Sequence, residues 1–203
     1  MGTEHFDATA ADWDRDEQKV VRAREVARAV ATAVPLGPRT RVLDYGAGTG
    51  LVTQALAAQI GSMTLADNSP GMRSVIRDKI ATGVLPGARV WDLDLERQAA
   101  PDERFDLIVT SLVLHHIRAL EPVLARFAEL LAPGGHLCIA DLDREDGSFH
   151  HHDFDGHHGF DRAELAAQLV AAGLVEVAVE DCTDFVRDGV TYSVFLAVAR
   201  RPL

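Results

Sequence analysis

Short apolar segments alternate with amphipathic segments along most of the chain. The apolar stretches have the length of strands, and the segments between them carry apolar residues at helical spacing. This alternation is typical of an α/β fold with a mostly parallel sheet covered by helices. The predicted strands are 41–46, 62–67, 88–93, 105–114 and 136–142, and the predicted helices are 16–34, 49–59, 70–81, 119–132 and 161–173.

The last part of the chain has a different pattern. Two strand-like segments, 174–185 and 190–201, are joined by the short turn "RDG", which predicts an antiparallel pair. A seven-stranded sheet with its last strand inserted antiparallel satisfies this count. We therefore expect a single domain over 1–203, with residues 1–34 as an N-terminal helical cap and 35–203 as the core.

Composition and charge narrow the class of protein. The chain has 203 residues, of which 47% are apolar and 25% charged, as in an ordinary globular domain. Its formal net charge of −11 argues against a nucleic-acid partner. The two cysteines, Cys138 and Cys182, lie in apolar stretches without CxxC spacing, so we expect reduced thiols. We find neither a leader pattern nor a run of roughly 20 apolar residues, and expect a cytoplasmic protein without a membrane segment.

The sharpest local signal is the glycine loop in "VLDYGAGTG". A buried strand ends at Asp44, Gly46, Gly48 and Gly50 follow at alternate positions, and a helix begins. Glycines let the backbone turn tightly and approach a ligand, and the helix N-terminus offers free N–H groups. A dinucleotide site expects its third glycine at position 51, where this chain has leucine. A nicotinamide-dependent oxidoreductase is therefore the alternative, and the less favoured one.

The form D-x-G-x-G-x-G resembles motif I of the class I, Rossmann-like S-adenosylmethionine-dependent methyltransferases. Further segments match the same family in order: "LADNSPGM", "DLDL", "FDLIVTSLVLHHI", "LLAPGGHL" and the N-terminal "FDATAADWD". The chain looks most similar to the small-molecule methyltransferases of the ubiquinone-biosynthesis-like group. The resemblance implies a three-layer α/β/α fold, S-adenosylmethionine as cofactor, a small-molecule acceptor, and an N-terminal helix that folds over the cofactor.

The resemblance also implies a cofactor site. Asp67 would accept hydrogen bonds from the ribose hydroxyls, Asp94 would accept from the adenine amino group, and Leu95 would cover the ring. The complete implied set is Asp44, Gly46, Gly48, Gly50, Asp67, Asn68, Met72, Asp94, Leu95 and Ser111.

The candidate acceptor side follows the fourth and fifth strands. Ligands of open α/β sheets bind outside the carboxyl ends of the strands, where His115, His116, Asp141 and Asp143 fall. His116 is the first candidate for a general base, with His115 and Asp141 as further catalytic candidates. A base is needed only if the acceptor carries a proton that must leave. Each of these side chains has the alternative of merely packing or bonding the backbone.

Residues 143–160, "DREDGSFHHHDFDGHHGF", hold five of the nine histidines. The segment follows the fifth strand, so we expect it to be an acceptor-facing loop. His150, His151 and His152, together with Trp13 of the cap, are the candidate substrate contacts. Imidazole and carboxylate also suit zinc. However, no HxxxH or HExxH spacing is present, and Gly156 and Gly159 favour a flexible loop. We therefore expect no metal.

Three hypotheses follow. The first is a methyltransferase acting on a small molecule, as a monomer or homodimer; the others are the oxidoreductase and a non-catalytic, cofactor-binding accessory protein. No "NPPY"-like or "DPPY"-like segment and no Pro-Cys pair occurs, which argues against adenine, glutamine or cytosine as the acceptor.

Overall fold

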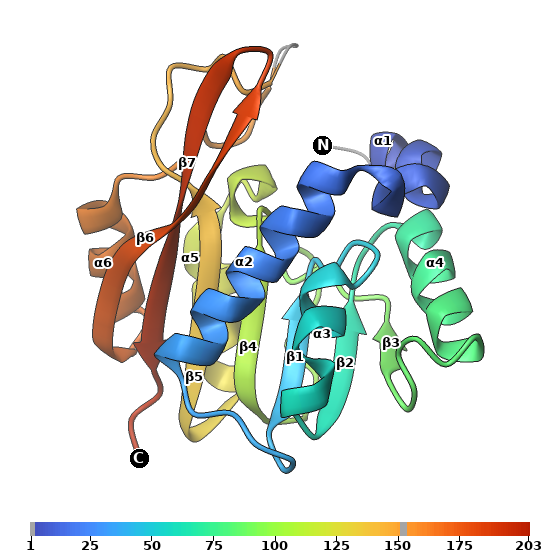
Figure 1. Cartoon of the computed structure of the whole chain (residues 1–203). Helices are drawn as coiled ribbons and strands as arrows, with labels where there is room; N and C mark the ends of the chain where they lie inside the picture. Colours follow the sequence, from blue (N-terminus) through green and yellow to red (C-terminus); the bar gives the residue numbers. More distant parts are fainter. Residues whose placement is uncertain (1–2, 151–153) are drawn as a thin grey trace.

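A computed structural model describes residues 3–150 and 154–203. Within them, seven strands form one sheet in the order β3-β2-β1-β4-β5-β7-β6 (Figure 1). The strands are β1 Arg41–Tyr45, β2 Ser62–Ala66, β3 Arg89–Trp91, β4 Phe105–Ser111, β5 Leu131–Leu142, β6 Val175–Arg187 and β7 Val190–Arg200. β1 to β5 pair in parallel, whereas β7 is inserted antiparallel between β5 and β6. The predicted α/β class and the antiparallel last strand are confirmed.

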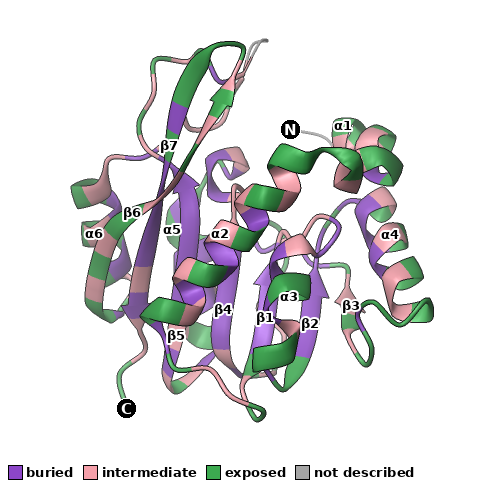
Figure 2. Cartoon of the chain, in the orientation of Figure 1, coloured by how far each residue is buried: buried purple, intermediate pink, exposed green. Residues whose placement is uncertain are grey.

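Helices cover both faces of the sheet. They are α1 Glu4–Thr9, α2 Glu17–Ala33, α3 Leu51–Leu56, α4 Pro70–Ala81, α5 Leu120–Leu130 and α6 Arg162–Ala171, with short 3₁₀ turns η1 Ala10–Arg15, η2 Ala57–Gln59 and η3 Leu114–His116. The buried side chains of α2, α3 and α4 pack in one core cluster, and those of α5 and α6 pack in the other. The central strands are mostly buried, and the helices show exposed outer surfaces (Figure 2).

Local sequence signals explain where several helices begin. Asp16 caps α2 by accepting from the N–H groups of Gln18 and Lys19. Asp161 caps α6 through Ala163 and Glu164. Both aspartates satisfy backbone donors that the first helical turn leaves unpaired.

Some predicted boundaries need correction. The apolar run 105–114 does not form one strand, because β4 ends at Ser111, Leu112 takes a left-handed φ of +56°, and the chain turns into η3. The predicted strand 88–93 shortens to Arg89–Trp91. The predicted helix 119–132 ends at Leu130, since Leu131 already pairs with Phe105 and "APGG" forms an irregularity within β5.

The arrangement brings three parts of the chain to the carboxyl ends of the parallel strands. α1 and η1, the turn η3, and the far end of the β6–β7 hairpin lie at this end of the molecule (Figure 1). Both cysteines are free thiols, as expected. Among the described helices, none is long and apolar enough to cross a membrane.

Candidate functional site

The glycine loop joins β1 to α3 through three left-handed residues. Gly46, Gly48 and Gly50 have φ values of +67°, +57° and +83°, which side chains rarely adopt. A Cβ at Gly46 would lie 2.4 Å from Val113 Cγ2, so this glycine allows the segment after β4 to pack on the loop. A Cβ at Gly48 would meet no described atom within 4 Å. Gly48 therefore leaves open space beside the backbone, as the approach of a ligand requires.

Asp44 lies beneath the loop at the end of β1. Its side chain is buried, and Oδ2 accepts from Thr53 Oγ1 of α3 at 2.6 Å. Burial raises the pKa of Asp44 to about 6, although the hydrogen bonds from Thr53 oppose this. The carboxylate thus ties β1 to α3 beneath the glycine loop.

Asp67 follows β2, next to the glycine loop. Oδ2 accepts from the Gly48 N–H at 2.8 Å, and Oδ1 accepts from the Ser69 N–H at 2.8 Å. Burial raises the pKa of Asp67, against the effect of these bonds. Each carboxylate oxygen retains a further lone pair, so Asp67 is fixed in place and can still accept from a diol.

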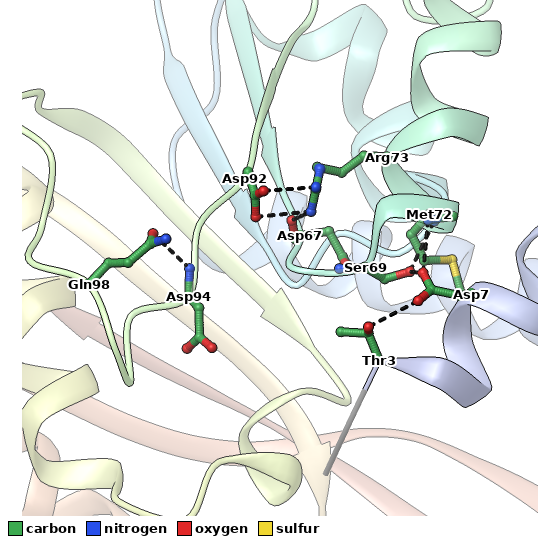
Figure 3. Close-up of polar contacts among 10 residues, drawn as sticks. Thr3, Asp7, Asp67, Ser69, Met72, Arg73, Asp92, Asp94 and Gln98 are labelled. Carbon is green, nitrogen blue, oxygen red and sulfur yellow. Dashed lines mark hydrogen bonds and ion pairs between the residues drawn. The ribbon is translucent and has the colours of Figure 1, made fainter.

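The segments after β2 and β3 are held together by an arginine. Arg73 of α4 donates to the Asp67 carbonyl at 2.9 Å and forms a two-bond ion pair with Asp92, at 3.0 and 2.8 Å. Asp94 lies two residues further along, where its N–H donates to Gln98 Oε1 and its carboxylate accepts from the Glu96 N–H. Figure 3 shows Asp67 between this segment and the N-terminal helix.

The remaining predicted cofactor residues lie around this centre. Met72 is buried in α4, Asn68 is exposed beside Asp67, and Ser111 ends β4. Leu95 is fully buried in the core, and its N–H donates to the Tyr45 hydroxyl at 2.9 Å. The structure thus gathers the strand-end residues at one edge of the sheet, with the Leu95 side chain on its core side.

The N-terminal cap is attached to the same edge. Asp7 of α1 accepts from Ser69 Oγ at 2.5 Å and from the Gly71 N–H at 2.9 Å (Figure 3). Its pKa is lowered, chiefly by the Ser69 hydrogen bond. Asp14 of η1 accepts from Thr49 Oγ1 at 2.5 Å and pairs with Lys79 at 2.6 Å. Two aspartates therefore dock the cap onto α4 and the glycine loop.

On the acceptor side, His115 and Asp141 form a buried pair. His115 Nδ1 lies 2.6 Å from Asp141 Oδ1, and both side chains are almost completely buried. Because an ionised carboxylate only accepts, Nδ1 carries the hydrogen and Nε2 keeps its lone pair. Asp141 also accepts from the N–H groups of Leu114 and Leu142, at 2.8 Å each. The aspartate therefore fixes both the histidine ring and the backbone of η3.

His116 is surrounded by aromatic rings and by other histidines instead. Phe6 of the cap packs edge-on against its ring, with centroids 5.4 Å apart, and Trp13 contacts Phe6. Burial, followed by the neighbouring His115 and His150, lowers the pKa of His116 to about 2. The ring is neutral at physiological pH and disfavours proton uptake, which weakens its candidacy as a general base.

The last residues of the histidine-rich segment are anchored to η3 and to β5. The His157 N–H donates to the His115 carbonyl at 2.8 Å, and the Phe160 N–H donates to Leu142 at 2.9 Å. A Cβ at Gly156 would lie 2.2 Å from the His115 carbonyl oxygen, and one at Gly159 would lie 2.0 Å from that of Asp143. The glycines therefore permit close backbone packing, which differs from the flexible role expected of them.

One predicted residue of the acceptor side, Asp143, has other surroundings than expected. Asp143 forms a two-bond ion pair with Arg162, at 2.7 and 2.6 Å, which anchors the start of α6. His151, His152 and Asp153 lie outside the described residues.

Sequence reasoning missed four residues of this edge. They are Asp7, Thr53, Ser69 and Arg73, which bind the functional segments to one another. Only Ser69, before Pro70, carried a local signal, since serine before a first-turn proline is a typical N-cap. The other contacts depend on tertiary packing.

Comparison with known proteins decides the family. A family model described as a methyltransferase domain matches residues 16–179. The chain belongs to this family. The class I methyltransferase predicted from the glycine loop is thereby confirmed, and S-adenosylmethionine is the cofactor of that class.

Individual relatives agree with this assignment. The biotin biosynthesis bifunctional protein BioCD of Bordetella avium is 41% identical over 145 residues, which are 69% of this chain and 30% of that protein. The methyltransferase solved with the Trm112 activator of Haloferax volcanii has a TM-score of 0.78 at 22% identity, over 98% of each chain.

A Haemonchus contortus phosphoethanolamine N-methyltransferase, solved with S-adenosylhomocysteine, has a TM-score of 0.73 at 15% identity over 86% of this chain and 51% of that one. These two structural likenesses show the fold. The chain spans less than a third of the length of the Bordetella relative.

Proposed function

We propose that this chain transfers a methyl group from S-adenosylmethionine to a small-molecule acceptor. The observation that carries the proposal is the joint position of Gly48 and Asp67. The Gly48 backbone borders open space, and its N–H fixes the Asp67 carboxylate at the carboxyl ends of β1 and β2. A diol-bearing nucleoside suits this arrangement, because the carboxylate accepts from hydroxyls and the bare backbone admits the ligand closely.

The proposed roles of the residues follow from their positions. Asp67 and Asp94 would accept from the ribose and adenine ends of the nucleoside, and the glycine loop would lie against it. The cofactor supplies an electrophilic methyl group on a sulfonium, so the protein mainly orients the partners and excludes water. The docked cap, through Phe6 and Trp13, would close the acceptor side against solvent.

On the acceptor side, the His115–Asp141 pair is the stronger candidate for handling a proton. Asp141 orients the His115 ring by bonding Nδ1 and leaves Nε2 with a lone pair, whereas His116 has no carboxylate among its described contacts. His116 and the His150 ring would instead shape the acceptor pocket. We also propose that the protein acts in the cytoplasm as a monomer or homodimer.

Calorimetric titration with S-adenosylhomocysteine tests the cofactor part of the proposal. Wild type should bind. Asp67→Asn should weaken the affinity roughly tenfold or more, because the asparagine amide has a single accepting oxygen where the carboxylate has two. Asp102→Asn is the matched control, since the Asp102 side chain is fully exposed. No binding by wild type would sink the proposal. Binding of NAD(P)H with hydride transfer would favour the oxidoreductase alternative.

The accessory-protein alternative needs a separate result. Tight binding of S-adenosylmethionine, no methylated product from any acceptor, and a copurifying enzyme partner would favour it. The size of the pure protein in solution, measured by light scattering, tests the oligomeric part of the proposal.

A further inference from the structure

Three histidines from two separate segments meet at the carboxyl ends of β4 and β5. His115 and His116 belong to η3, and His150 comes from the segment after β5. One ring nitrogen of each lies within 4.8 Å of those of the other two. The ring centroids of His115 and His116 are 4.1 Å apart, and each lies 5.5 Å from that of His150.

The surroundings hold each ring in place. Asp141 binds His115 Nδ1, which leaves Nε2 of that ring with a lone pair. Phe6 packs edge-on against His116. Phe154 stacks on His150, with centroids 3.6 Å apart and planes 20° apart. The cluster is therefore enclosed by aromatic side chains on two sides and by a carboxylate on the third.

One ring nitrogen of the cluster, His116 Nδ1, lacks a hydrogen bond within the described chain. His116 Nδ1 is buried and has no hydrogen-bond partner in the part of the chain that the structure describes. A buried polar atom without a partner costs roughly 1–3 kcal/mol. Coordination of a cation by this ring is one way in which the cost is removed.

We propose that His115, His116 and His150 bind a divalent first-row transition metal ion of the zinc type. Imidazole nitrogens suit Zn²⁺ and its neighbours rather than Mg²⁺ or Ca²⁺. Zn–N bonds of about 2.0–2.1 Å require nitrogens roughly 3.3 Å apart. Nitrogens 4.8 Å apart have to approach by about 1.5 Å, which small changes in the side-chain torsion angles of the three histidines supply without leaving their staggered positions.

Asp141 completes the argument for this class of ion. A histidine that ligates a metal ordinarily donates its other ring N–H to a carboxylate or carbonyl, which orients the ring and makes it a better ligand. The His115–Asp141 pair has this arrangement. Sequence spacing did not reveal the site, because its third ligand follows β5 and lies outside any HxxxH pattern. The proposal therefore departs from our expectation that the chain binds no metal.

Three protein ligands leave a coordination position open, as in catalytic zinc sites. The site lies on the acceptor side, so an oxygen, nitrogen or sulfur atom of the acceptor is a suitable fourth ligand. This role rests on the proposed methyltransferase function and replaces proton transfer by His115, because its Nε2 is then a metal ligand; binding of the ion itself does not rest on that function.

Titration of the metal-free full-length protein with Co²⁺ tests the proposal. Tetrahedral imidazole coordination should produce visible absorption bands that saturate at one ion per chain and disappear when Zn²⁺ is added. His116→Gln and His150→Gln should each weaken Co²⁺ affinity at least tenfold. His158→Gln is the matched control, because His158 belongs to the same segment but bonds Glu145 outside the cluster. It should leave the affinity unchanged.

Three results would overturn the metal site: no saturable binding by wild type, unchanged affinity in both cluster variants, or equal weakening by His158→Gln. Thermal unfolding of each variant confirms that it is folded. Titration of the same samples with S-adenosylhomocysteine separates the two proposals. Cofactor binding without Co²⁺ binding defeats the metal site alone, and Co²⁺ binding without cofactor binding defeats the proposed function alone.

Discussion

At the scale of residues, three aspartates at strand ends have three different surroundings. Asp44 is buried beneath the glycine loop, Asp67 is held by two backbone N–H groups, and Asp94 is partly exposed. The sequence alone predicts all three as residues of the cofactor site and does not distinguish their surroundings. Their surroundings differ because β1 is central in the sheet whereas β3 is its edge strand. We therefore expect substitution of these carboxylates to have different consequences.

Asp44→Asn should stabilise the protein at neutral pH. The folded pKa of Asp44, about 6, lies above its ordinary value of 3.8, so the folded protein binds this proton more tightly than the unfolded chain does. Asp44 therefore costs nothing below about pH 4, and its cost grows as the pH rises to about 6. Removal of the charge should raise the free energy of unfolding by up to about 3 kcal/mol at pH 7.5 and by little at pH 4.

Urea denaturation at the two pH values measures this effect. Asp106→Asn is the contrasting variant, because hydrogen bonds from Arg41 lower the pKa of Asp106 and ionisation of that carboxylate is favourable. It should lose stability at pH 7.5. A loss of stability by Asp44→Asn at pH 7.5 would contradict our interpretation of its burial.

Gly46→Ala and Gly48→Ala should separate folding from ligand binding. Both glycines have positive φ, but only Gly46 has a neighbour, Val113, where a methyl group would lie. Gly46→Ala should lower the free energy of unfolding by about 2 kcal/mol or more. Gly48→Ala should lower it by about 1 kcal/mol and should weaken S-adenosylhomocysteine binding. Equal losses of stability in the two variants would show that the Val113 contact does not matter.

At the scale of elements, the period of the apolar positions predicts the order and type of nearly every helix and strand. It fails where the same apolar run serves two purposes. Residues 105–114 are mostly apolar, yet only the first part pairs in the sheet, and the left-handed Leu112 sends the remainder into η3. The cluster of His115, His116 and His150 was equally unpredictable, because it depends on how the segment after β5 packs against η3.

The docking of the cap gives a prediction at this scale. Asp7→Ala removes the acceptor for Ser69 and Gly71, so the cap should detach from α4 more often. Trypsin cleavage after Arg15, which is the first arginine or lysine in the sequence, should become roughly fivefold faster or more. Glu4→Ala, in the same helix but exposed, should leave the rate unchanged. Equal rates for wild type and Asp7→Ala would show that these bonds do not hold the cap.

At the scale of the whole molecule, the fold places the cap, the glycine loop and η3 around the carboxyl ends of the strands. The sequence predicted that these segments gather at the carboxyl ends of the strands, because parallel strands bring their last residues together. It could not predict the contacts across it, such as Asp14 with Thr49 or Phe6 with His116, since the partners lie far apart in the chain. Family membership and this geometry both support our proposal that methyl transfer is the central function.

Methyl-labelled S-adenosylmethionine, incubated with the protein and a fractionated extract of its source cells, tests that function most directly. We predict that the label passes to a compound in a small-molecule fraction, and that Asp67→Asn greatly reduces the transfer while Asp102→Asn does not. Appearance of the label only in protein or nucleic acid would contradict the small-molecule acceptor. Absence of transfer to every fraction, by a protein that binds S-adenosylhomocysteine, would contradict the methyltransferase account itself.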